Sequence, residues 1–178
     1  PEYNINYKNM NNYDNSNIRR QDRILEADQA LNLLINGEYG FLAMSNDGSA
    51  YGIPISYIYS DNKIYLHCAP EGEKLRYIEK NPSVCFCVVG STMVQPAKFT
   101  TAYESVLAFG DIVTVDDNDE RMKALELLVD KYSPEYKEIG LKYAKGSFSR
   151  TTVLRIDIKR ISGKSKRSDA PSVTDRSK

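Results

Sequence analysis

A histidine and a lysine stand seven residues apart where an expected strand gives way to an expected helix. His67 is the sole histidine of the 178-residue chain, and Lys74 falls at the start of a short helical segment. A helix N-terminus presents unpaired N–H groups and a partial positive charge, which suit a phosphate. Lys74 adds a formal charge, and His67 adds a donor or a second charge. The pair predicts an anion site, unless His67 is structural or Glu71 and Glu73 satisfy the helix start themselves.

The strand expected at residues 49–59 is a second candidate, because its two faces differ in size. Its odd positions are bulky, namely Tyr51, Ile53, Ile55, Tyr57 and Tyr59. Its even positions carry Gly52, Pro54 and Ser56. Successive side chains point to opposite faces, so the small residues form a flat face for a planar aromatic ligand. Pro54 removes one ladder donor and favours an edge strand. The alternative is an ordinary solvated edge strand.

Further along the chain, Ser105 and Val106 lie in a strand expected at 103–109. The Ser105 hydroxyl can bond a phosphate or a ring edge, or it is an ordinary strand serine. No dinucleotide, Walker or nucleophile-elbow motif is present. A single histidine excludes sites that need two or more imidazoles, and we expect no metal site.

The elements that must position these residues are strands and short helices. We expect helices at 27–36, 73–80, from Asp117 to Tyr132, and between Pro134 and Gly146. Strands are expected at 39–45, 49–59 and 63–68 as an antiparallel meander, then at 84–89, at 99–115 with a bulge at Gly110, and at 152–161. The result is an α+β fold: a mostly antiparallel, six- to seven-stranded sheet able to close into a barrel, with three or four flanking helices.

Composition bounds the remaining classes. The chain has 24 Lys+Arg and 24 Asp+Glu, so its net charge of zero argues against a broad basic field for nucleic acid. The apolar runs are far shorter than the roughly 20 residues of a membrane-spanning helix. Three cysteines cannot all pair and favour a reducing, cytoplasmic setting. We expect a flexible arm at 1–17, one folded domain at 18–161 and a disordered tail at 162–178.

Several short motifs, taken in order, resemble one family. They are GEYGFLA at 37–43, IPISY at 53–57, YLHCAPEGEKL at 65–75, NPSV at 81–84 and YESVLAFG at 103–110. Together they resemble the nitroimidazole-resistance (Nim-type) branch of the pyridoxamine 5'-phosphate oxidase-like flavin proteins, over residues 19–161. Glu73 departs from the family pattern, where many relatives have a small or basic residue.

The resemblance implies a split β-barrel that dimerises and binds flavin between subunits, with FMN expected and FAD as the alternative. It places segment 53–57 along the isoalloxazine ring, His67 near the flavin, Lys74 at the phosphate and Ser105 in the same pocket. The implied cofactor-binding residues are Pro54, Ile55, Ser56, Tyr57, His67, Lys74, Leu75, Ser105 and Val106.

The leading hypothesis is a cytoplasmic, homodimeric, FMN-dependent oxidoreductase that reduces nitroimidazoles or similar electron-poor small molecules, with His67 as catalytic proton donor. Nucleic acid and membrane are not expected partners. One alternative is pyridoxamine-phosphate oxidation, which needs a second basic phosphate pocket that the sequence does not reveal. Another is a non-catalytic module holding haem or flavin, in which His67 is the only imidazole available to iron. A third is an interaction protein with an empty cleft.

Overall fold

The computed structural model describes residues 12–167. Its helices are α1 (Ala27–Asn36), α2 (Glu73–Lys80), α3 (Asn118–Tyr132) and α4 (Lys137–Ser147). Its strands are β1 (Gly40–Asn46), β2 (Ser49–Ile55), β3 (Ile58–Ser60), β4 (Lys63–Cys68), β5 (Ser83–Gln95), β6 (Thr100–Thr114) and β7 (Thr152–Lys166). Short 3₁₀ turns precede α1 and α4, follow α4, and connect β5 to β6. The α+β class and all four expected helices are confirmed.

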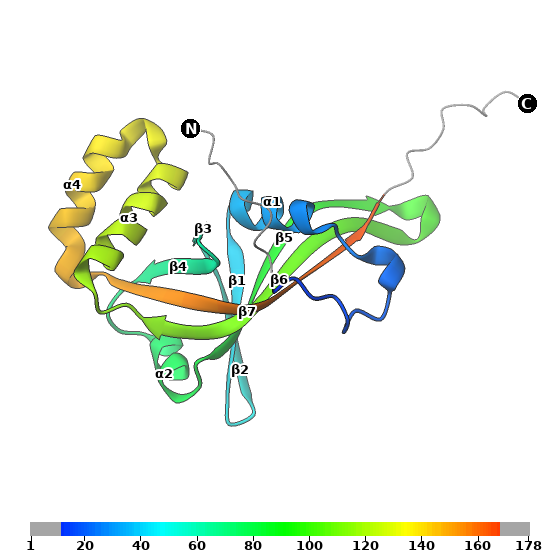
Figure 1. The fold of residues 1–178 in the computed structure, drawn as a ribbon, viewed down its shortest axis with the longest axis horizontal. Helices are drawn as coiled ribbons and strands as arrows, with labels where there is room; N and C mark the ends of the chain where they lie inside the picture. Colours follow the sequence, from blue (N-terminus) through cyan, green and yellow to red (C-terminus); the bar gives the residue numbers. More distant parts are fainter. Residues whose placement is uncertain (1–11, 168–178) are drawn as a thin grey trace, which may run out of the picture.

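The strands form one antiparallel sheet in the order β2-β1-β5-β6-β7-β4-β3. Its two edges, β2 and β3, are separated along the chain by only Ser56 and Tyr57. A sheet whose edges are consecutive in sequence must curl until those edges meet, which makes a barrel (Figure 1). Within residues 12–167 no ladder joins β2 to β3, so the barrel is split at this point.

The expectation of one continuous strand at 49–59 and of a three-stranded meander is therefore wrong. The chain leaves the ladder at Ser56, and β2 and β3 pair with β1 and β4 on opposite edges. Tyr57 finds its backbone partners elsewhere: its N–H donates to the Tyr132 hydroxyl and its carbonyl accepts from Lys131. Side chains of α3 thus replace the missing sheet partners at the break.

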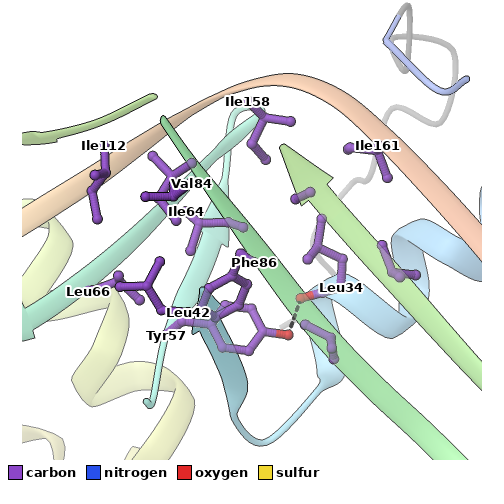
Figure 2. Close-up of a cluster of buried hydrophobic side chains, with 14 of the residues drawn as sticks. Leu34, Leu42, Tyr57, Ile64, Leu66, Val84, Phe86, Ile112, Ile158 and Ile161 are labelled. Carbon is purple, nitrogen blue, oxygen red and sulfur yellow. Dashed lines mark hydrogen bonds between the residues drawn. The ribbon is translucent and has the colours of Figure 1, made fainter. Parts of the chain in front are cut away.

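The barrel interior is filled by side chains that alternate along the strands. Leu42 of β1 and Ile64 of β4 are fully buried, as the period of two requires. The Tyr57 ring packs edge-on against Phe86 with centroids 4.9 Å apart. Its hydroxyl donates to the carbonyl of Leu34 at 2.6 Å, which ties α1 to the barrel (Figure 2).

Two sequence expectations concern the long strands β6 and β7: a bulge at Gly110 and the end of β7 at residue 161. The bulge expected at Gly110 is present as a register shift after Phe109. A Cβ at Gly110 would lie 2.2 Å from the carbonyl oxygen of Asp157, so only glycine allows this approach.

β7 runs on through Lys166, and Ser162 is buried, so residues 162–166 are not a disordered tail. The rest of that predicted tail, from 168 onward, lies outside the described residues.

The predicted N-terminal arm is also in part a packed segment. Asp14 donates its N–H to the carbonyl of Ile161, and the Tyr13 hydroxyl donates to the carbonyl of Leu25. Residues 12–17 therefore lie along β7, because a β-bridge and the partly buried Tyr13 phenol hold them there. The remainder of the arm, residues 1–11, lies outside the described residues.

Helices α3 and α4 form a hairpin at one end of the sheet, over the outer face of β4 (Figure 1). Asp117 caps α3 by accepting the Glu120 N–H at 2.7 Å, as its spacing predicts. Val115, Leu125 and Leu128 are buried beneath the hairpin, in a cluster separate from the barrel interior. Among residues 12–167, no helix has the length and apolar character needed to cross a membrane.

Candidate functional site

A cleft of about 930 Å³ opens between the end of β4 and the α3–α4 hairpin. Its sheet side is formed by Ser56, His67, Cys68 and Ala69. Its helical side is formed by Leu125, Leu128, Val129, Tyr132, Ser133, Tyr136, Ile139, Gly140, Tyr143, Ala144, Ser147, Arg150 and Thr151. This size and apolar character are typical of small-molecule sites.

His67 reaches the cleft because of the alternation along β4. Leu66 points into the barrel, while Tyr65 and His67 face the helical hairpin. His67 is exposed and makes no hydrogen bond to any residue between 12 and 167. Desolvation by its neighbours lowers the pKa of His67, so at neutral pH the imidazole is uncharged. It offers one donor and one acceptor to a ligand.

Tyr65, two residues earlier on the same face, is fixed rather than free. Its hydroxyl donates to Glu120 at 2.8 Å, and Arg155 donates to both oxygens of that carboxylate. Desolvation alone would raise the pKa of Glu120, but the hydrogen bonds from Tyr65 and Arg155 outweigh it, and the pKa is lowered. Desolvation and the Glu120 contact raise the pKa of Tyr65. This network holds the start of α3 against β4.

The cleft floor at Ser56 is held by the other end of α3. The Tyr132 hydroxyl accepts the Tyr57 N–H at 2.9 Å and donates to the carbonyl of Glu38 at 2.6 Å. The Lys131 ammonium donates to the Tyr57 carbonyl at 3.0 Å and lies 3.9 Å from the centroid of the Tyr57 ring. Desolvation lowers the pKa of Lys131 to about 8. Two adjacent residues of α3 therefore fix the strand break beside the cleft.

The start of α2 lies next to the sheet side of the cleft. Gly72 precedes the helix with φ 145°, a conformation that favours glycine. Lys74 is half-buried and makes no hydrogen bond or salt bridge with any described residue. Burial raises the pKa of the cleft-lining Cys68 thiol, and the charge of Lys74 opposes that rise. Lys74 does not line the cleft itself and follows the cleft-lining Ala69 by five residues. Glu73 is exposed.

Of the nine predicted cofactor-binding residues, Ser56 and His67 line the cleft, and Lys74 lies in the first turn of α2, just after its sheet side. Tyr57 and Val106 are 0% exposed, so their side chains belong to the barrel interior and cannot contact a ligand. Both side chains point inward, so a contact of Tyr57 or Val106 with a cofactor is left to their backbone atoms.

Ile55 and Leu75 are partly buried and pack against the barrel interior, and Pro54 is exposed on β2. The flat face predicted from Gly52 is partly occupied, because a Cβ there would lie 2.4 Å from the Phe41 ring. Phe41 is the cross-strand neighbour of Pro54, and its ring lies against Gly52. The prediction of an uncovered flat face is thus wrong at Gly52. Ser56 is the residue of this segment that lines the cleft.

Ser105 does not join the cleft within one chain. It pairs with Lys164 on β7, whereas His67 lies level with Val153 on the same strand. Eleven positions along β7 correspond to roughly 35 Å of extended strand. The folded chain therefore keeps Ser105 away from His67 and Lys74.

None of the residues on the helical side of the cleft was predicted from the sequence as a site residue. Tyr136, Ile139 and Tyr143 are 65%, 67% and 75% exposed and line the cleft. Their spacing of three and then four residues places them on one helical face, while Ala144 is buried on another. The sequence signal for this side of the cleft is a set of large apolar residues on a face of α4 other than the one that carries the buried Ala144.

A second hollow of about 1030 Å³ lies between α1 and the β5–β6 hairpin. Its lining includes Glu38, Glu104 and Lys166, and none of the predicted site residues. Within residues 12–167, no group of three potential metal-ligating side chains comes together. The cleft beside His67 is therefore the candidate site.

Solved structures confirm the fold. A candidate 5-nitroimidazole antibiotic resistance protein from Bacteroides thetaiotaomicron aligns at 19% identity with a TM-score of 0.65, covering 80% of this chain and 86% of that one. A flavocytochrome from Azotobacter vinelandii aligns at 18% identity with a TM-score of 0.67, covering 80% and 68%. An FAD- and haem-binding protein from Mycobacterium smegmatis aligns at 18% identity with a TM-score of 0.64, covering 76% and 69%.

A search among curated proteins finds no match to the sequence. The sequence profile of the family described as pyridoxamine 5'-phosphate oxidase matches residues 26–165, which span the barrel and the helical hairpin. The chain therefore belongs to the pyridoxamine 5'-phosphate oxidase family.

Proposed function

We propose that this protein is a flavin-dependent reductase of electron-poor small molecules such as nitroimidazoles. The observation that carries the proposal is the cleft lined by Ser56 and His67, with Lys74 in the first turn of the helix that follows β4. The neighbours with flavin, FAD or nitroimidazole resistance in their names support the same assignment.

The residues present fit a flavin. The half-buried Lys74 has no anionic partner among the described residues, and it stands at the start of an eight-residue helix. Such an arrangement would hold a phosphate, and the exposed Glu73 would not need to enter the site. Ser56, at the break between β2 and β3, would offer its hydroxyl and backbone to the edge of the ring. FMN is the expected form, and FAD is the alternative.

When bound, the flavin would supply the electrons for reduction. The chain's part would be to hold the ring, keep water from it and supply hydrogen bonds. His67 is uncharged at neutral pH, so it would act there through its ring N–H rather than as an imidazolium acid.

A second copy of the chain would complete the site. Phe41, Cys87 and Leu107 are cross-strand neighbours on the outer face of the sheet, and Phe41 is 45% exposed. Ser105 lies on that same outer face of β6. We propose that a homodimer covers this apolar face and that the partner supplies the Ser105 that one chain cannot bring to His67.

Sedimentation of Leu107→Glu tests the homodimer. A buried charge at the centre of the apolar face should give a monomer that has also lost its flavin. Asp28→Lys, on the exposed side of α1, is a matched control for a charge change away from the face. A Leu107→Glu protein that stays dimeric with bound flavin would remove this face from the proposal.

The absorption spectrum of the purified protein, followed by titration with FMN and FAD, tests the cofactor. Lys74→Ala should weaken flavin binding roughly 10- to 150-fold, the range for loss of a desolvated charged hydrogen bond. Lys80→Ala, at the far end of the same helix, should not change it. Absence of flavin binding, or equal affinity in the two variants, would refute the assignment. Bleaching of the flavin bands and their recovery with a nitroimidazole would then test the reductase.

A haem-binding module is the second candidate, because His67 is a free imidazole in an apolar cleft. Two of the structural neighbours are a flavocytochrome and a haem-binding protein. In that case haem titration should produce a Soret band that His67→Ala abolishes. A Soret band without flavin bands would favour this function over the reductase.

A further inference from the structure

The helical side of the cleft differs from its sheet side in both chemistry and exposure. Tyr132, Tyr136, Ile139 and Tyr143 present large rings and an aliphatic chain to the cleft, and each is at least 37% exposed. Tyr136, Ile139 and Tyr143 belong to neither buried cluster, whereas Tyr132 also anchors α3 through its hydroxyl. Exposed aromatic side chains around a concave space are suited to stack on a planar ligand.

The only formally charged side chain that lines the cleft, among the described residues, is a cation. No aspartate or glutamate is among its lining residues in the described part of the chain. Arg150, at the end of the turn after α4, lines the cleft and forms no hydrogen bond or ion pair with a described residue. His67 is uncharged at neutral pH, so the Arg150 guanidinium is the one formal charge that the wall presents.

A guanidinium is a planar fork of donors that matches a carboxylate in a bidentate pair. Hydroxyl groups of Ser133 and Tyr136 line the same wall and can bond a polar substituent. The lining thus combines rings for a planar body, one cation for an acid group and no anion to repel it.

We propose that the cleft takes aromatic carboxylic acids: the ring stacks between the tyrosines of the α3–α4 wall, and Arg150 binds the carboxylate. This inference rests on the proposed function, in which such a molecule would be the electron acceptor beside the flavin. It narrows the acceptor class from electron-poor aromatics in general to those that carry a carboxylate.

The test compares three probes of one shape on the flavin-loaded protein: 4-nitrobenzoate, 4-nitrobenzamide and 4-nitrobenzylamine. Calorimetric titration should show the carboxylate binding about fivefold more tightly than the neutral amide, which is the size of one partly exposed charge pair. The cationic amine should bind most weakly. Cyclohexanecarboxylate should bind more weakly than 4-nitrobenzoate, because it lacks a face that stacks.

Arg150→Gln should remove the preference for carboxylate over amide while leaving the affinity for the amide unchanged. Tyr143→Ala should weaken both aromatic probes alike. Lys145→Gln is the matched control for Arg150→Gln, since it removes an exposed cation of α4 that does not line the cleft. Its probe affinities should equal those of the unmodified protein.

Equal binding of carboxylate and amide, or a preference that survives Arg150→Gln, would overturn the inference. Tighter binding of pyridoxine 5'-phosphate than of 4-nitrobenzoate would overturn it too, in favour of a phosphate ligand. The flavin spectrum is recorded first, so failure of flavin binding counts against the proposed function. Failure of probe discrimination with flavin bound counts against this inference alone.

Discussion

The barrel interior and the α3–α4 wall are built by different kinds of contact. The interior is a continuous apolar cluster in which Phe86, Leu42 and Ile64 are fully buried. The wall covers a smaller apolar cluster and is anchored by polar bonds at both ends of α3. Those anchors are Glu120 with Tyr65 at one end and Tyr132 with the Tyr57 backbone at the other.

The two kinds of contact predict different stabilities for the barrel interior and the α3–α4 wall. Apolar burial is strong but non-directional, whereas each hydrogen bond contributes only about 1 kcal/mol yet fixes a position. The interior should therefore set the global stability, and the wall should be the part that opens at lower free energy. A cleft bounded by such a wall can admit a ligand without disturbing the barrel.

Truncating the barrel interior should have the largest effect. Phe86→Ala removes a fully buried ring that packs against Tyr57 and leaves a cavity. The free energy of unfolding should fall by about 3–5 kcal/mol in urea titration. Phe99→Ala, where the ring is 97% exposed, should change it by less than about 0.5 kcal/mol. Equal effects of the two variants would mean that the barrel interior does not set the stability.

The next largest effect is expected at the start of α3. Glu120→Ala leaves the Tyr65 hydroxyl, in a residue 8% exposed, without its acceptor, so unfolding should become easier by about 1–3 kcal/mol. Because the folded pKa of Glu120 lies below 4.5, this contribution is present above pH 4.5 and lost as the pH falls through the folded pKa.

Urea titration from pH 7 to pH 3 checks both the size and the pH dependence of the Glu120 effect. Asp119→Ala, an exposed carboxylate in the same helical turn, should cost under about 1 kcal/mol. A Glu120→Ala effect no greater than that of Asp119→Ala would show that the polar anchor does not hold the wall.

The sequence predicted most elements because their signals are local. The capping pair at Asp117 and Glu120 marks the start of α3, and Asn81-Pro82 marks the end of α2. The break at Ser56 has no such signal, since the partners of Tyr57 are Lys131 and Tyr132, more than seventy residues away along the chain. Only the closed barrel brings them together.

The candidate site divides in the same way. Alternation along β4 was enough to place His67 opposite Leu66, and the structure confirms it. Alternation also grouped Tyr57 with Ile55 on the bulky face, and both pack toward the barrel interior. It could not show that Ser105 lies far along β6 from His67, because that separation depends on the pairing of three strands.

At the other end of α3, a smaller effect is expected from Tyr132→Phe. The change keeps the ring but removes the acceptor of the Tyr57 N–H and the donor to the Glu38 carbonyl. Global stability should fall by about 1 kcal/mol, and the Tyr57 amide should exchange its hydrogen faster. Tyr143→Phe, with an exposed hydroxyl, should do neither. Unchanged exchange at Tyr57 in Tyr132→Phe would mean that the break is held by other contacts.

Lys131→Met should change the slope of the unfolding free energy against pH, and the experiment compares that slope. The folded pKa of Lys131 is about 8 against an ordinary 10.5, so between these values the unfolded chain binds a proton that the folded chain does not. The unfolding free energy of the unmodified protein should therefore rise with pH relative to Lys131→Met, by at most about 1.4 kcal/mol per pH unit. Denaturant titrations from pH 7.5 to 9.5 measure the difference, and the cysteines, common to both proteins, cancel. Parallel stability curves would show that the amine beside the Tyr57 ring remains well solvated, and that the wall meets the barrel less closely than its hydrogen bonds imply.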